Sequence, residues 1–188
     1  MLEYTVHTEE SAPEGSKLVL KQVKAGMGFV PNLMATLSES PASVAAYSTL
    51  MSIFEKSDFT PTEKQVVLMT NNRLNGCYYC MAAHSTVSKM QGVSDSDIET
   101  LRNGTSFGDP KLEAIRVFTE QVFHTRGNVS DVDVDAFIGA GYTKGNVLEV
   151  VLGTGLKVLS NYSHKFTKAP VDKAFEPMAW SPDQVVSS

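Results

Sequence analysis

Cysteine and basic residues are both scarce in this chain. Its 188 residues include two cysteines and one tryptophan, and 21 acidic residues against 16 basic ones give a formal net charge of −5. A general nucleic-acid-binding protein carries a basic patch or stripe, so this balance argues against one. No apolar run approaches the roughly 18 residues that a membrane-spanning helix needs. We therefore expect a protein that binds neither nucleic acid nor a membrane.

A secretory signal is also missing from the first residues. Residues 1–10 contain neither the basic region nor the apolar core of a signal peptide. We therefore expect a cytoplasmic location, where thiols are normally kept reduced. A CxxC pair in that compartment is more often catalytic, redox-sensing or metal-binding than a structural disulfide.

Apolar residues recur at helical spacing along most of the chain, and strand patterns are nearly absent, so we predict an all-α fold. The clearest start signal is Thr60-Pro61-Thr62-Glu63, in which Thr60 caps the helix and Glu63 completes a capping box. We expect a polar arm over residues 1–14, one helical domain over 15–167, and a C-terminal tail over 168–188 that docks on it. The predicted helices cover residues 14–26, 32–38, 40–54, 60–73, 77–91, 94–102, 109–125, 131–138 and 143–166.

The two cysteines form a CxxC pair, and a histidine follows them at helical spacing. On an ideal helix Cys77, Cys80 and His84 project from one face. If the helix begins near Cys77, its free N–H groups and dipole favour a thiolate there, and a neighbouring histidine can carry a proton. A thiolate reacts with a peroxide to give a sulfenic acid, which a second thiol converts to a disulfide. The three groups therefore predict a minimal thiol peroxidase.

Three alternatives remain open for this motif. Two buried free cysteines can pack as small apolar groups. Cys77, Cys80 and His84 could bind zinc, with His124 or His164 as a fourth ligand, although no second two-ligand knuckle accompanies them. The pair could also be a redox-sensing or partner-binding switch. A thioredoxin-like fold would require strands around the motif.

The wider pattern Gln65-x11-Cys77-x2-Cys80-x3-His84, preceded by Asn75-Gly76, resembles the alkylhydroperoxidase D and carboxymuconolactone decarboxylase family, and within it the bacterial peroxidase-related branch. The similarity covers about residues 15–176. It continues in residues 62–68 and 82–85, in Asn161-Tyr162-x-His164, and in Pro170, Asp172 and Phe175.

The resemblance implies an alkylhydroperoxidase D-like helical bundle with the CxxC pair at a helix N-terminus, assembled into trimers or hexamers, without a cofactor or metal. It implies reduction of a small-molecule hydroperoxide, with a dithiol or a thioredoxin-like protein as reductant. By position, Cys80 is the attacking thiol, Cys77 the resolving thiol and His84 the proton carrier. The decarboxylase branch lacks this cysteine pair, so the resemblance favours a peroxidase over a lactone decarboxylase.

The chain departs from this pattern at Gln65, where the well-studied peroxidases have a glutamate. Glutamine can hold a hydrogen bond but cannot take a proton. We expect Gln65 to remain part of the site, with the proton relay running through His84 and water or using a carboxylate from elsewhere. Glu149 is the candidate lender, because residues 149–152 echo residues 65–68.

Three further positions complete the predictions. Tyr79 stands where the best-known peroxidase has a histidine, and its side chain is expected either to line a pocket beside the thiols or to pack with a buried hydroxyl. His164 is expected to be a histidine of the core or of an interface rather than a catalytic group. His124, near a helix C-terminus, is expected to be structural.

Overall fold

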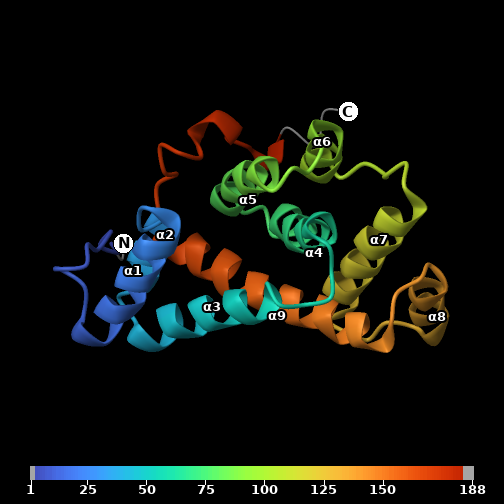
Figure 1. Ribbon diagram of the computed structural model, residues 1–188, viewed down its shortest axis with the longest axis horizontal. Helices are drawn as coiled ribbons and strands as arrows, with labels where there is room; N and C mark the ends of the chain where they lie inside the picture. Colours follow the sequence, from blue (N-terminus) through green and yellow to red (C-terminus); the bar gives the residue numbers. More distant parts are fainter. Residues whose placement is uncertain (1–2, 184–188) are drawn as a thin grey trace.

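The chain folds into helices joined by short connections, as the computed structural model of residues 3–183 shows (Figure 1). Across this described part there is no strand, which confirms the all-α prediction. Every predicted helix is present, with ends that differ by a few residues at most. They are α1 (Glu14–Met27), α2 (Asn32–Leu37), α3 (Pro41–Phe54), α4 (Pro61–Leu74), α5 (Tyr78–Met90), α6 (Asp95–Asn103), α7 (Pro110–Thr125), α8 (Asp131–Gly139) and α9 (Lys144–Thr167).

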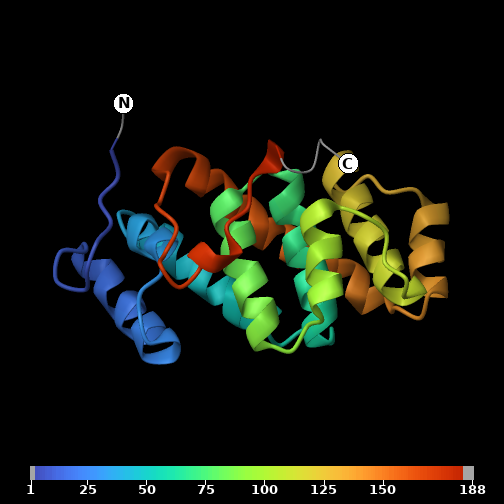
Figure 2. The same cartoon turned by 90° about the horizontal axis from the view of Figure 1, so that it is seen from above.

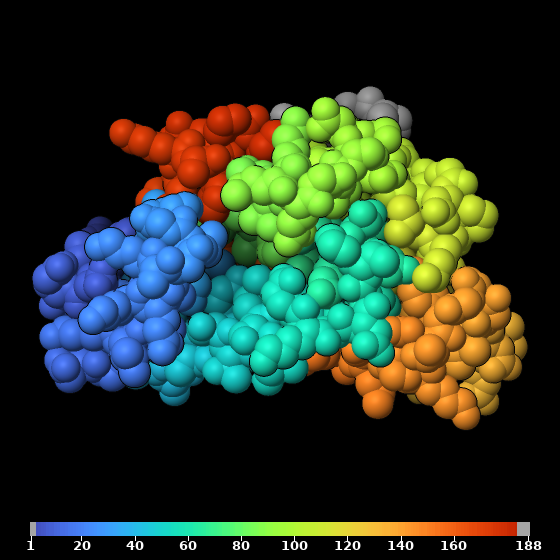
Figure 3. Space-filling model, in the orientation of Figure 1, coloured from blue at the N-terminus to red at the C-terminus, as the bar shows by residue number. Residues whose placement is uncertain are grey.

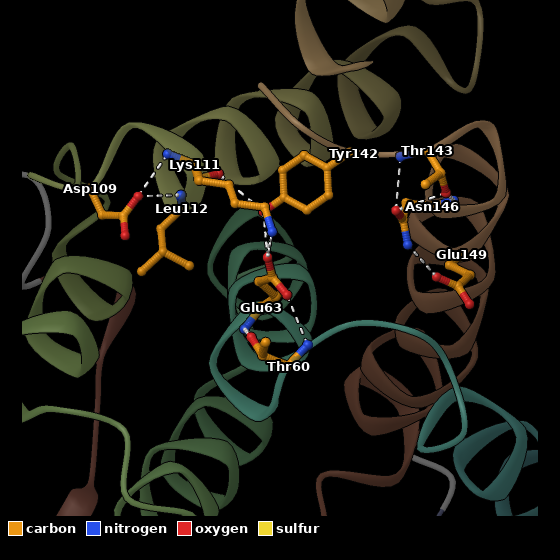
Figure 4. A network of polar contacts seen from close by, with 9 residues as sticks. All are labelled: Thr60, Glu63, Asp109, Lys111, Leu112, Tyr142, Thr143, Asn146 and Glu149. Carbon is orange, nitrogen blue, oxygen red and sulfur yellow. Dashed lines mark hydrogen bonds and ion pairs between the residues drawn. The ribbon is translucent and has the colours of Figure 1, made fainter. Parts of the chain in front are cut away.

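The start of α4 follows the sequence signal closely. The Glu63 N–H donates to Thr60 Oγ1 at 3.2 Å, and the Thr60 N–H donates to Glu63 Oε2 at 2.8 Å, so the capping box is present. The Glu63 carboxylate also accepts a hydrogen bond from the Tyr142 hydroxyl at 3.0 Å and pairs with Lys111 at 3.0 Å (Figure 4). Glu63 therefore joins α4 to α7 and to the connection between α8 and α9.

Helix α4 lies in the middle of the molecule and packs against α5, α7 and α9 (Figures 1 and 2). Its central residues, 66–69, have no exposed surface. The long helix α9 approaches it closely at Gly153, where a Cβ atom would lie 2.6 Å from Val67 Cγ1 and 2.8 Å from Phe54 Cε2. Glycine is needed there because any side chain would separate α9 from α3 and α4.

After α9 the chain crosses over α5 and ends in a short 3₁₀ turn, η1 (Glu176–Met178) (Figure 2). Arg102 of α6 donates to the carbonyl oxygens of Met178 and Ala179, and the Trp180 indole donates to the Arg102 carbonyl. This C-terminal segment, residues 168–180, therefore packs on the helices as predicted for the tail. Residues 1–2 of the predicted arm and 184–188 of the predicted tail lie outside the described residues, and the three-part division of the chain stays a prediction.

Candidate active site

The cysteine pair lies where α4 turns into α5. Gly76 has a φ of +62°, a left-handed conformation that glycine adopts without strain. Cys77 is the N-cap of α5, and its sulfur accepts the Cys80 N–H at 3.4 Å. Both thiols are free and almost fully buried. The CxxC pair is therefore at a helix N-terminus as predicted, but Cys77 itself is not helical, so the ideal-helix geometry does not describe its side chain.

Three buried asparagines hold this turn in place. Asn75 donates to Asn161 Oδ1 at 3.0 Å, and Asn161 donates to Asn72 Oδ1 at 3.0 Å. Asn72 in turn donates to the Cys80 carbonyl at 3.2 Å and accepts the Cys77 N–H on its own carbonyl at 2.9 Å. Because buried amides are costly unless they are paired, this closed set fixes the two cysteines against α9.

The two thiols have opposite electrostatic environments. Burial opposes ionisation of Cys80, but the hydrogen bond from Cys77, the positive charge of Lys157, and hydrogen bonds from Asn161 and Ser160 together lower its pKa. The pKa of Cys77 is raised by its hydrogen bond to Cys80, by burial and by the negative charge of Cys80. Cys80 is therefore the sulfur favoured as a thiolate, and Cys77 the one that keeps its proton.

His84 and Gln65 lie together, and a lysine joins them. His84 Nδ1 is 2.9 Å from Gln65 Oε1, and Gln65 Nε2 donates to Gln91 Oε1 at 2.9 Å. His84 Nε2 is 3.1 Å from Lys157 Nζ, which has no exposed surface. Since an ammonium only donates, Nε2 accepts from Lys157 and the proton of the imidazole is on Nδ1.

This arrangement keeps His84 neutral. Burial and the adjacent positive charge of Lys157 lower the pKa of His84 well below its ordinary value. A second proton on Nε2 would also place a donor against the ammonium. Two groups near Cys80 can carry a proton, Lys157 and His84. Lys157 is the cationic one, and His84 is the neutral acceptor that orients the Lys157 ammonium.

Lys157 was missed in the sequence analysis, although a signal for it exists. Helix α9 carries polar residues at spacings of three and four on its buried face, namely Lys157, Ser160, Asn161 and His164. A lysine in such a buried polar stripe needs a partner, which an exposed lysine does not. The spacing could have placed Lys157 on the same face as the asparagine that contacts the thiols.

The prediction that Glu149 lends a carboxylate to the site is wrong. Its carboxylate accepts a hydrogen bond from Asn146 Nδ2 at 2.8 Å (Figure 4). It also accepts one from the Asp58 N–H at 3.1 Å. Eight residues separate it from Lys157, which corresponds to about 12 Å along the helix. Glu149 therefore stabilises the start of α9 and the loop before α4.

Tyr79 and His164 are buried supports beside the thiols. The Tyr79 hydroxyl donates to Asp172 Oδ2 at 2.6 Å and accepts the Leu33 N–H at 3.1 Å, and burial together with Asp172 raises its pKa. His164 Nε2 is 3.1 Å from the Ala169 carbonyl, and its ring lies against Tyr79. His164 is thus the core histidine that was predicted, and the Tyr79 hydroxyl is engaged in holding the C-terminal segment.

A cavity of about 260 Å³ lies beside these groups. It opens between the N-terminal helices and α5, where Figure 3 shows a hollow between the blue and green parts of the chain. Exposed residues form its mouth: Gln22, Gly26, Met27 and Glu55. Buried residues close its inner end: Tyr47, Gln65, Tyr79 and His84.

Tyr47 links this cavity to the thiols. It lines the inner end, and burial together with the charges of Cys80 and Cys77 raises its pKa. Neither cysteine lines the cavity, so its inner end approaches the reactive sulfur through Tyr47.

The zinc alternative receives no support from the geometry. Both ring nitrogens of His84 are engaged, one with Gln65 and the other with Lys157. Within residues 3–183, no three His, Cys, Asp or Glu side chains gather as a metal site would require.

Across residues 3–183, none of the helices has the length and the apolar composition that a membrane span requires.

The helical fold is the one seen in an alkylhydroperoxidase D-like protein of known structure. Residues 41–120, which contain the whole Gln65–His84 motif, match the sequence model of the carboxymuconolactone decarboxylase family. The family resemblance predicted from the sequence is thereby confirmed. No curated protein matches the sequence.

Solved structures share this fold over nearly the whole chain. The alkylhydroperoxidase AhpD core structure of a peroxidase-related protein from Ralstonia eutropha JMP134 superposes with a TM-score of 0.82 at 20% identity, over 92% of this chain and 93% of that one. A peroxidase-related protein from Silicibacter sp. TM1040 gives 0.76 at 14% identity, over 87% of each chain. A variant of the debrominase Bmp8 in complex with 2,3,4-tribromopyrrole gives 0.73 at 15% identity, over 97% of this chain and 96% of that one.

Proposed function

We propose that this protein is a thiol-dependent peroxidase that reduces alkyl hydroperoxides through a Cys77–Cys80 disulfide. The observation that carries the proposal is the contrast between the two sulfurs. Lys157 and the hydrogen bond from Cys77 stabilise a thiolate at Cys80, while Cys77 keeps its proton. The family match and the peroxidase-related structures support the same chemistry.

In the first step the Cys80 thiolate attacks the terminal oxygen of the hydroperoxide. A sulfur–oxygen bond forms, the O–O bond breaks, and the alkoxide that leaves takes a proton to become an alcohol. Lys157 supplies this proton in our proposal, and His84 holds its ammonium group in place. Gln65 fixes the tautomer of His84 that makes this possible.

In the second step Cys77 attacks the sulfenic sulfur of Cys80. The disulfide forms, and the hydroxyl group leaves as water with the proton of the Cys77 thiol. An external dithiol or thioredoxin-like protein then reduces the disulfide, and its two protons restore the Cys77 thiol and the Lys157 ammonium. Each dithiol oxidised thus converts one hydroperoxide to one alcohol and one water.

The test is the consumption of t-butyl hydroperoxide with dithiothreitol as reductant. We expect steady turnover by the wild type and none above background by Cys80→Ser. Equal, slow consumption by both proteins would disprove the peroxidase. A wild type that forms the disulfide once but does not turn over would instead support the redox switch.

A second candidate is the reductive removal of bromine from a small halogenated ring. It is favoured by the structural similarity to the debrominase complex and by a cavity of about 260 Å³ next to a thiolate. In that reaction a carbon–bromine bond is replaced by a carbon–hydrogen bond, bromide leaves, and the two thiols become a disulfide. Bromide release from 2,3,4-tribromopyrrole in the presence of dithiothreitol, compared between wild type and Cys80→Ser, tests it.

We also propose that the protein is a cytoplasmic homo-oligomer, a trimer or hexamer as the resemblance implies. The outer face of α9 carries large apolar side chains that are half or more exposed, including Leu148 and Phe166. Isolated chains rarely leave such a stripe in water, and a second copy would cover it. Sedimentation equilibrium of the purified protein measures the state directly.

A further inference from the structure

The cavity beside Cys80 has a composition that selects among hydroperoxides. Its walls are formed by methionine thioethers, aromatic rings and aliphatic side chains: Val23, Met27, Leu33, Met34, Met51, Val87 and Phe175. The polar side chains of the lining are few: Gln65, His84 and the two tyrosines at the inner end, Gln22 and Glu55 at the mouth, and Ser48 of α3. A ligand with an apolar body and one polar end therefore matches the cavity when the polar end points toward Tyr47 and His84.

Charge is nearly absent from the lining. Glu55 at the mouth is the one charged residue among those that line the cavity, and it is exposed. His84 at the inner end is neutral, and Lys157, which is not part of the lining, is engaged with His84. The Glu55 carboxylate is paired with Lys64 at 3.8 Å, and an anionic ligand that passed it would lose its hydration among apolar side chains without meeting a cation of the lining.

The size and shape of the cavity further limit the ligands that it can hold. A volume of about 260 Å³ is below the range of roughly 300–1,000 Å³ typical for drug-sized ligands, so the body of the ligand holds on the order of ten non-hydrogen atoms. Thioether sulfurs adapt to irregular shapes and make favourable contacts with aromatic rings. Met34, Met51 and Phe175 together suit a compact ring better than a long flexible chain.

We propose that the cavity binds uncharged hydroperoxides with a compact, preferably aromatic body, and that it discriminates against hydrogen peroxide and against hydroperoxides that carry a carboxylate. This inference rests on the proposed peroxidase function and names its substrate class. The bonds made and broken are those of the two steps above, with an arylalkyl hydroperoxide giving the arylalkyl alcohol. The cavity contributes binding energy that only the apolar body can use.

The experiment compares kcat/KM for three oxidants with the wild-type protein, with dithiothreitol as reductant. Cumene hydroperoxide should exceed hydrogen peroxide by at least about tenfold, because the apolar body fills the cavity. Its para-carboxylated analogue should be at least about tenfold poorer than cumene hydroperoxide, because its charge has no partner in the cavity. Equal values for cumene hydroperoxide and either of the other two would overturn the proposal.

A matched pair of variants on α3 tests whether the hydroperoxide binds in this cavity. Met51 lines the cavity, whereas Ile53 is 49% exposed and does not. Met51→Trp should lower kcat/KM for cumene hydroperoxide at least about tenfold more than for hydrogen peroxide, and Ile53→Trp should leave both unchanged. If Met51→Trp does not fold, Val87→Trp narrows the same cavity from α5. An unchanged preference in a folded cavity variant would place the substrate elsewhere.

Binding of cumyl alcohol, the uncharged product, separates the two proposals. We expect calorimetric binding to wild type and to Ile53→Trp, and none to Met51→Trp. If cumyl alcohol binds but no peroxide is consumed, the peroxidase proposal fails while the ligand class stands. If hydrogen peroxide and cumene hydroperoxide are consumed equally and cumyl alcohol does not bind, the ligand class fails while the peroxidase stands.

Discussion

The Lys157 ammonium donates to His84 Nε2 across 3.1 Å, and both side chains are buried. A buried cation requires compensation, and the thiolate of Cys80 supplies the negative charge that responds to Lys157. Gln65 lies on the Nδ1 side of the imidazole, and Lys157 takes the electrostatic role on the Nε2 side. The site thus combines a neutral histidine with a lysine and a thiolate.

Removal of the positive charge of Lys157 should raise the pKa of Cys80. In Lys157→Met the thiolate loses its positive partner, and we expect the second-order rate with t-butyl hydroperoxide to fall by roughly 10²–10³-fold. The pKa is measured by the ultraviolet absorbance of the thiolate as a function of pH, and the rate by stopped flow. Lys165→Met, an exposed change on the same helix, is the control. A Cys80 titration that does not move in Lys157→Met would exclude the role given to the lysine.

The reaction should depend on pH with the sign set by Cys80. Its pKa is lowered in the folded protein, so the reactive thiolate persists below the ordinary thiol pKa of about 8.5 and is lost only as pH falls through the lower folded value. The same shift makes the reduced protein gain stability relative to Cys80→Ala as pH rises from the folded pKa toward that of the unfolded thiol. Peroxide kinetics and urea unfolding at several pH values measure the two effects. A rate that already declines as pH falls through about 8.5, together with a pH-independent stability difference, would contradict the depressed pKa.

The role of Cys77 can be isolated without loss of the helix cap. A serine at this position can accept the Cys80 N–H as an N-cap residue, so Cys77→Ser should fold normally. It should react once with peroxide and then retain a sulfenic acid on Cys80, because no second thiol can resolve it. Mass spectrometry after dimedone trapping detects that species. Recovery of a disulfide-like resting state in Cys77→Ser would mean that another group resolves the intermediate.

Tyr79 should contribute to stability rather than to proton transfer. In Tyr79→Phe the Asp172 carboxylate loses a donor at 2.6 Å and the buried Leu33 N–H loses its acceptor, which should lower the free energy of unfolding by about 1–3 kcal/mol. Tyr78→Phe, at a side chain that is 40% exposed, should change it by less than about 0.5 kcal/mol. Urea unfolding compares the two variants. A large loss of peroxide reactivity in Tyr79→Phe without loss of stability would reverse the assignment.

A glutamate in place of Gln65 should not raise the rate of the peroxide reaction. In Gln65→Glu a carboxylate would accept the Nδ1–H of His84 and raise the pKa of the histidine, and its negative charge would oppose the thiolate. We expect a peroxide rate no higher than that of the wild type and a histidine that titrates closer to its ordinary range. Nuclear magnetic resonance of the imidazole and stopped-flow kinetics report the two quantities. A rate well above wild type would show that Gln65 is a defect rather than part of a different arrangement.

The helices could be predicted from the sequence because their signals are local. Thr60, Pro61 and Glu63 lie within four residues of one another and determine where α4 begins. The CxxC pair, Gln65 and His84 were also found, since all four lie within 20 residues and their spacing carries the chemistry. The structure then brings Gln65 and His84 into contact, as their pattern suggested.

What the sequence did not reveal depends on contacts between distant elements. Lys157 is separated from His84 by 73 residues, and only the packing of α9 against α4 and α5 decides that it is buried. The echo between residues 65–68 and 149–152 directed attention to Glu149, which lies about two turns too early on that helix. The cavity is formed by six segments of the chain, so no local pattern describes it.

The hydrogen bonds between Tyr79, Leu33 and Asp172 have a consequence for how the protein is made. The thiols leave the ribosome with α5, but the groups that shelter and charge them come from α9 and from the C-terminal segment. During synthesis the cysteine pair therefore remains without Lys157 until some 80 further residues have been added. A nascent chain should accordingly react with oxidants as ordinary cysteine does, and the reactivity particular to Cys80 begins only after α9 has been made and has packed beside it.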